Sequence, residues 1–149
     1  MKIDKLGLIL YLLAISPAVA ANQQPDAIGH IQTLKGAVSI QRGSNNLSAS
    51  VGIPVLCNDT VRTGKAAAAS VVMSDDSTLA LGPNSELALK DYIFNPKEGK
   101  FSFVTRMAKG TFSYLSGIIG KLSPGSIRIE TPEATIAVRG TKLLVSVEE

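Results

Sequence analysis

Short runs in which apolar and polar residues alternate recur through much of the chain. They occupy residues 37–40, 126–130, 135–138 and 143–147. Residues two apart point to the same face of a β-strand, so each run predicts a strand with one face in the core. Glycines fall at or between these runs, where strands reverse or bulge. The pattern predicts an all-β domain of many short strands.

The middle of the chain shows a spacing of eight residues. Leu79 and Leu81 recur as Leu87 and Leu89, with a Gly-Pro-Asn-Ser turn between the pairs. On a helix, residues two apart lie about 200° apart, so these pairs would not form one apolar stripe. The strand spacing fits a compact sandwich, a barrel, or a β-solenoid or roll of stacked strands, and the spacing of eight favours stacked strands. Residues 111–124 are less regular, and at most a short helical turn is expected near 116–122.

The N-terminal residues have the layout of a secretory signal peptide. Lys2 and Lys5 precede an uncharged apolar run, and Ala18-Val19-Ala20 offers the small residues that signal peptidase requires. The run is too short to span a bilayer, which takes about 20 helical residues. We expect residues 1–20 to be cleaved, residues 21–27 to form a mobile leader and residues 28–149 to form the folded domain. No stable membrane anchor is expected after cleavage.

The charges are few and scattered. The chain carries 15 Lys and Arg residues against 12 Asp and Glu residues, a formal net charge of +3. A nucleic-acid-binding protein normally gathers its basic residues on one face, so nucleic acid is not an expected partner. One His and one Cys are too few for a structural zinc site or a disulfide framework within the chain. We expect no metal site and no cofactor.

The reactive residues form no recognisable catalytic pattern. Gly120-Lys121 lacks the flanking glycine and hydroxyl residues of a phosphate-binding loop. His30 is interpreted as a partly exposed strand residue, with a general base as the alternative. Asp75-Asp76 is interpreted as a turn, with catalytic or calcium-binding carboxylates as the alternative. Cys57 is expected to be a small buried apolar side chain, with a reactive thiol as the alternative. The sequence therefore predicts that the protein is not an enzyme.

Two segments resemble the FecR domain. The first begins at Asn58-Asp59-Thr60-Val61-Arg62-Thr63-Gly64 and continues to the turn at Pro83-Asn84-Ser85. It is similar to the family's Gly-Asp, apolar, x, Thr-Gly pattern, although Asn58 stands where the family usually has Gly. The second, residues 131–141, is similar to the family's Thr-Pro and apolar-Arg-Gly-Thr elements. Together with Leu34-Lys35-Gly36-Ala37-Val38, the resemblance extends from about Ile28 to Val147.

This resemblance implies a function. The founding members of the family are regulators with a cytoplasmic segment that binds a sigma factor, a transmembrane helix and this domain in the periplasm. Only a few residues precede the apolar run here, so we expect no cytoplasmic sigma-regulating segment. The expected function is an exported, non-catalytic protein-interaction or sensory module of the bacterial envelope. We expect it to be periplasmic or secreted, and to bind an envelope or secreted protein.

An alternative function stays open. An all-β exported chain also fits a structural or adhesive surface protein, which could bind polysaccharide. Carbohydrate sites typically stack sugars on aromatic side chains, and the absence of Trp counts against such a site.

The resemblance also supplies the candidate partner-binding or motif residues, which are Asp59, Thr63, Gly64, Arg139, Gly140 and Thr141. The last three form a corner. Ile136 and Val138 share one face of the predicted strand, so Arg139 should point from the opposite face. Gly140 permits a positive φ that other residues resist. The corner is interpreted as a strand that ends in a turn, or as a surface that contacts a partner.

Overall fold

The computed structural model describes residues 26–148. The predicted signal peptide and residues 21–25 of the predicted leader lie outside the described residues, and Asp26 and Ala27 lead into the first strand without regular structure. Within residues 26–148, no helix is long and apolar enough to cross a membrane.

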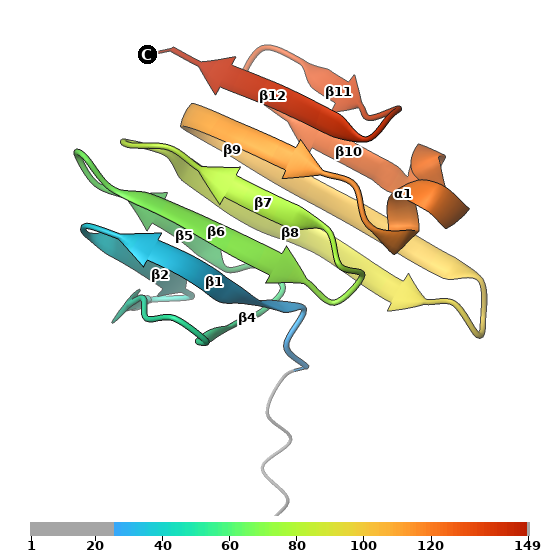
Figure 1. The fold of residues 1–149 in the computed structure, drawn as a ribbon, viewed down its shortest axis with the longest axis horizontal. Coiled ribbons are helices and arrows are strands. Elements are labelled where there is room, and N and C mark those ends of the chain that lie inside the picture. Colours follow the sequence, from blue (N-terminus) through green and yellow to red (C-terminus); the bar gives the residue numbers. More distant parts are fainter. Residues whose placement is uncertain (1–25, 149) are drawn as a thin grey trace, which may run out of the picture.

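The all-β prediction is confirmed. A single sheet curls into a half-barrel whose strands lie in two layers (Figure 1). The first layer contains β3 (Asn45–Ser48), β2 (Val38–Arg42), β5 (Thr60–Thr63), β8 (Glu86–Asn95), the start of β9 (Lys100–Leu115), β10 (Ile127–Glu130) and β11 (Thr135–Ala137). The second layer contains β4 (Pro54–Val55), β1 (Gly29–Lys35), β6 (Ala68–Met73), β7 (Thr78–Leu81), the end of β9 and β12 (Lys142–Val147).

Strand β9 belongs to both layers. Residues 100–109 pair with β8, whereas residues 110–115 pair with β12 and residues 112–115 also with β7. Gly110 lies at the change, with a φ of +96°, and a Cβ there would collide with Ser85. Both the backbone angle and the lack of space require glycine at this point. The chain can therefore pass from one layer to the other within one strand.

The core lies between the layers and explains the alternating sequence pattern. Ile31, Val71 and Leu79 point inward from the second layer, and Ile40 and Leu87 point inward from the first; all five are fully buried. Burying one such side chain contributes about 1.5–3 kcal/mol to the hydrophobic stabilisation. The two-residue period of the sequence is thus the period of this two-layer core.

The spacing of eight residues has a different cause from the one expected. Leu79 and Leu81 lie on β7 in the second layer, whereas Leu87 and Leu89 lie on β8 in the first. The turn at residues 82–85 carries the chain between layers, so the two pairs meet in the core and do not stack in successive coils. Apart from β9 with β10, neighbouring strands are antiparallel, which also separates this curled sheet from a solenoid.

The predicted helical turn is confirmed. Helix α1 (Ile118–Leu122) and a 3-10 turn (Pro124–Ser126) connect β9 to β10. The helix has no capping bond from the residue before it. Its first amides instead bind Asp75: the Ile118 amide donates to the Asp75 carbonyl (2.7 Å) and the Ile119 amide donates to its carboxylate (3.1 Å). A contact between distant residues fixes this helix, which is why local alternation failed to define it.

Candidate functional site

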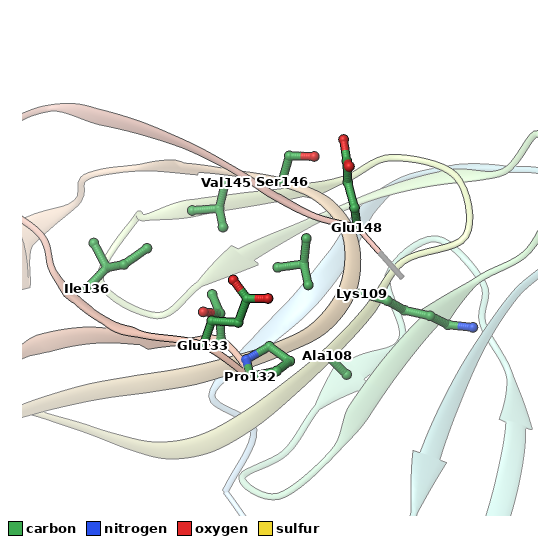
Figure 2. Close-up of a pocket in the computed structure, with 10 residues that line it drawn as sticks. Ala108, Lys109, Pro132, Glu133, Ile136, Val145, Ser146 and Glu148 are labelled. Carbon is green, nitrogen blue, oxygen red and sulfur yellow. The ribbon is translucent and has the colours of Figure 1, made fainter.

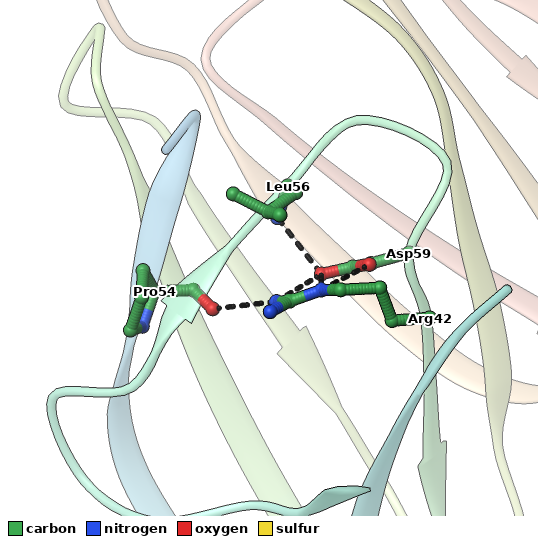
Figure 3. A network of polar contacts seen from close by, with 4 residues as sticks. All are labelled: Arg42, Pro54, Leu56 and Asp59. Carbon is green, nitrogen blue, oxygen red and sulfur yellow. Dashed lines mark hydrogen bonds and ion pairs between the residues drawn. The ribbon is translucent and has the colours of Figure 1, made fainter. Parts of the chain in front are cut away.

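Asp59 is buried in a polar network. It precedes β5, and only 1% of its surface is exposed. The Arg42 guanidinium on β2 donates to both carboxylate oxygens, with Nε to Oδ1 at 3.0 Å and Nη2 to Oδ2 at 2.8 Å (Figure 3). The Leu56 amide donates to Oδ2 at 2.8 Å. This two-point geometry is the strong form of a carboxylate–guanidinium pair.

The Arg42–Asp59 pair links the two layers. Arg42 lies on β2 in the first layer, and its Nη2 also donates to the carbonyl of Pro54 on β4 in the second layer, at 3.1 Å (Figure 3). The hydrogen bonds to Asp59 raise the pKa of Arg42, outweighing the opposite effect of its burial. We call this junction between β2 and β4 the closed seam.

Thr63 and Gly64 also stabilise the fold through hydrogen bonds. The Thr63 hydroxyl donates to the Gly82 carbonyl (2.6 Å) and accepts from the Ser85 amide (2.9 Å). The Gly64 amide donates to the Ala37 carbonyl at 2.9 Å. Because Asp59 and Thr63 are buried, their side chains offer no surface to a partner. The interpretation of Asp59 and Thr63 as residues that contact a partner is therefore replaced: their side chains hold turns together.

Asn58 adopts the conformation for which the FecR-like motif usually has glycine. Its φ is +69°, in the left-handed region that Asn tolerates better than most residues. Its amide donates to the Leu89 carbonyl at 2.7 Å. The departure at this position therefore leaves the turn intact.

The second motif lies at the surface. Residues 138–141 connect β11 in the first layer to β12 in the second. Val138 is buried, whereas Arg139, Gly140 and Thr141 are exposed, and the exposure of Arg139 agrees with the predicted strand faces. Gly140 has a φ of +119°, and no atom would lie within 4 Å of an added Cβ. Its requirement for glycine is conformational, since the space beside it is empty.

A cleft opens between the same two strands. Its volume is about 630 Å³, and its walls come from β12, the turn between β10 and β11, and the bulged part of β9 (Figure 2). Ile136 and Val145 give it an apolar side, Glu133 adds a carboxylate, and the side chain of Glu148 at the rim points away from it. Among residues 26–148, no strand pairs with the outer edge of β11 or β12. We call this region, from the cleft to the corner at 139–141, the open seam.

Asp75 has a role that the sequence interpretation missed. It lies in the expected turn, yet it is fully buried. Its Oδ1 accepts from the hydroxyls of Ser77 (2.6 Å) and Tyr92 (3.0 Å), while Oδ2 accepts from the Ile119 amide. The neighbouring Asp76 is exposed. The short Ser-Asp-Asp-Ser segment signals a turn, but only the tertiary contacts with Tyr92 and Ile119 show that Asp75 joins a turn, a strand and a helix.

The aromatic residues near Asp75 form a row in which Phe103 and Tyr114 are buried and Tyr92 is partly buried. Tyr92 packs edge-on against Phe103 with ring centres 5.5 Å apart, and Phe103 packs against Tyr114 at 5.6 Å. Burial, followed by the negative charge of Asp75, raises the pKa of Tyr92 far above its ordinary value. Burial also raises the pKa of Tyr114. Both phenols therefore keep their protons to higher pH than an exposed tyrosine does.

His30 and Cys57 are both exposed. The predicted exposure of His30 on a strand is confirmed, since it lies on β1. The predicted burial of Cys57 is wrong: its side chain is exposed, and its thiol lies 3.5 Å from the Lys90 carbonyl. Val55 turns into the core, but the chain then enters the turn before Asp59, so strand alternation no longer applies at Cys57.

Comparison with known proteins identifies one family. Residues 59–149 match the sequence model described as "FecR protein". No curated protein matches the chain. Among solved structures, a chain described as "Cell surface anchoring domain" has 27% sequence identity and a TM-score of 0.40, and the alignment covers 41% of this chain and 82% of that one.

Proposed function

The chain belongs to the FecR protein family, and from that membership we propose that it is an exported, non-catalytic module that binds another protein of the bacterial envelope. The family is regulatory and sensory. The signal-peptide pattern at residues 1–20 supports export to the periplasm or beyond. The partner is an envelope or secreted protein, and the open seam is the surface that contacts it.

The contrast between the seams carries this proposal. At the closed seam, Arg42, Asp59 and the Pro54 carbonyl satisfy one another's hydrogen-bonding groups. At the open seam, the connection between the layers exposes Arg139, and a cleft lies between the outermost strands. Protein-binding sites are enriched in Arg, which brings both an apolar stem and several hydrogen-bond donors. Arg139 is therefore the contact residue of the corner, and Gly140 sets its shape.

The buried carboxylates support a non-catalytic role. A catalytic carboxylate must reach substrate, but Asp59 and Asp75 are buried and accept hydrogen bonds from the protein itself. The hydrogen bonds that these two carboxylates accept hold turns in place. The exposed His30 lies on β1, outside the residues that line the cleft at the open seam.

Export is tested by N-terminal sequencing of the protein from the periplasmic fraction or the medium. We expect the mature chain to begin at Ala21. A chain that retains Met1 would contradict export by a cleaved signal peptide.

Partner binding is tested by photo-crosslinking in cells. A photoreactive amino acid replaces Arg139 or Glu133 at the open seam, and the matched control replaces Val51, which is 68% exposed and precedes β4 near the closed seam. We expect a crosslinked envelope protein with the first two variants and not with the control. Equal labelling at all three positions, or crosslinked polysaccharide in place of protein, would contradict the proposal.

A further inference from the structure

Strand β12 presents an unpaired edge with an unusual composition. Within the part of the chain that the structure describes, it pairs with β9 on one side and with no strand on the other. The other outermost strands are poor templates for pairing: β4 has two residues and contains Pro54, β11 has three residues, and β3 is mostly polar. By contrast, β12 has six residues, Lys-Leu-Leu-Val-Ser-Val, without proline. Natural edge strands usually carry features that prevent pairing, and β12 lacks them between its two ends.

The backbone of β12 shows which groups are free. The Ser116 amide donates to the Thr141 carbonyl at 2.8 Å, in line with the register that pairs Lys142 with Leu115. Backbone groups in a strand point alternately to the two sides. Positions 141, 143, 145 and 147 thus point to β9, and Lys142, Leu144 and Ser146 direct their N–H and C=O groups to the open edge.

The side chains of β12 alternate in the same way. Val145 is buried, and Leu143 and Val147 pack partly against the core. Leu144 faces the outside with 72% of its surface exposed, beside a shallow groove of about 490 Å³ that includes Ala80 and Ser113. The unpaired edge itself is a template for pairing with another chain, and the exposed leucine adds apolar surface beside it.

We propose that two copies of this chain associate through antiparallel pairing of their β12 edges, which joins the second layers into one continuous sheet. A twofold axis perpendicular to the sheet brings like faces together, so outward residues pair with outward residues. With Val145 at the axis, Leu144 lies opposite Ser146 and Lys142 lies opposite Glu148.

This register gives hydrogen-bond partners to the free backbone groups of the edge and also places opposite charges across from each other. The opposed residues are those whose backbone groups point outward, so each pair exchanges N–H···O=C bonds. The two Leu144 side chains become diagonal neighbours on the outer face, within reach of each other. Lys142 meets the exposed Glu148 of the other copy twice, once on each side of the axis. A register centred on Leu144 would oppose Lys142 to Ser146 and lose this complementarity.

The first test is the oligomeric state of the purified protein, measured by sedimentation velocity over a range of concentrations. We expect a monomer–dimer equilibrium. A protein that is monomeric up to about 1 mM, where even a binding free energy of about −4 kcal/mol gives a dimer, overturns the proposal and leaves the edge to a strand of another protein.

Two variants at Leu144 test the backbone pairing. Leu144→Pro removes an N–H that points to the open edge, and proline is tolerated where the N–H faces outward. It should weaken the dimer at least about tenfold, a loss of about 1.4 kcal/mol, with an unchanged β-sheet circular dichroism spectrum. The control Leu144→Thr keeps the amide and should weaken the dimer less. A folded Leu144→Pro protein that dimerises like the unaltered chain would place the interface elsewhere and overturn the proposal.

Charge exchange tests the register without altering the backbone. Lys142→Glu opposes two carboxylates at each end of the pairing and should weaken the dimer, most strongly at low salt. The double variant Lys142→Glu with Glu148→Lys restores opposite charges and should recover the dimer. Failure of the double variant to recover it would overturn the pairing of Lys142 with Glu148.

Discussion

The closed seam and the open seam of the half-barrel have the same kind of connection, but its charged residue is buried at one seam and exposed at the other. At each seam the chain crosses between the layers, from β4 to β5 at the closed seam and from β11 to β12 at the open seam. The first crossing buries its charged residue, Asp59, against Arg42, whereas the second exposes Arg139. Two segments that resemble different motifs of one family therefore lie in different settings, one buried in the fold and one exposed at the surface.

The largest expected effect comes from breaking the closed seam. Asp59→Ala removes the carboxylate that accepts hydrogen bonds from Arg42 and from the Leu56 amide, and leaves Arg42 only the Pro54 carbonyl among the acceptors of this junction. Loss of one partner of a buried ion pair costs about 3–5 kcal/mol, and we expect about 2–4 kcal/mol here because the Arg42 side chain is 33% exposed. Chemical denaturation monitored by circular dichroism measures this change in the free energy of unfolding.

The control for Asp59→Ala is Glu98→Ala. Glu98 pairs with Lys100 at 3.2 Å, and both side chains are mostly exposed. An exposed pair contributes about 0–1 kcal/mol, so this variant should unfold almost as the unaltered chain does. Similar losses in both variants would contradict a special role for the closed seam.

At the open seam, Gly140→Val tests the backbone of the corner. The positive φ of Gly140 disfavours a β-branched residue, so the variant should lose about 1–3 kcal/mol of stability. Gly125→Ala is the control, because Gly125 also has free space around it but no positive φ. If both variants unfold alike, backbone strain does not define the corner.

Alkaline pH tests whether the Asp75 cluster belongs to the rigid part of the molecule. The unfolded chain releases tyrosine protons near pH 10, but the folded chain holds the pKa values of Tyr92 and Tyr114 higher. Above about pH 10 the unfolded state binds fewer protons than the folded state, so the free energy of unfolding falls as pH rises. Below pH 10 this contribution is fully present.

Denaturation between pH 8 and pH 12, together with tyrosinate absorption, measures this effect. Tyr92→Phe should reduce the loss of stability at high pH, because one raised pKa is removed. Ionisation of both tyrosines near pH 10 in a chain that stays folded would show that the cluster is open to solvent.

The sequence predicts the parts of this structure that depend on local alternation. Leu79, Leu81, Leu87 and Leu89 all turn into the core, and the corner at Arg139 has the expected exposed side chain. The expectations that failed depend on a distant contact or on a turn that interrupts the alternation. The buried Asp59 carboxylate is paired with Arg42, which lies on another strand, and Cys57 is exposed because the chain turns before Asp59. Two-residue periodicity reveals neither the pairing of Asp59 with Arg42 nor the turn at Cys57, so periodicity alone could not predict these outcomes.

The smallest expected change in stability is that of Arg139→Ala, and this variant tests the central claim most directly. Its melting temperature and its capture of a crosslinked envelope protein in cells are measured together with those of Gly140→Val. The account predicts a melting temperature close to that of the unaltered chain, since exposed substitutions usually change stability by less than about 0.5 kcal/mol, and a clear loss of capture. If Arg139→Ala instead lowers stability as much as Gly140→Val, or captures the partner fully, Arg139 is not the contact residue of the open seam.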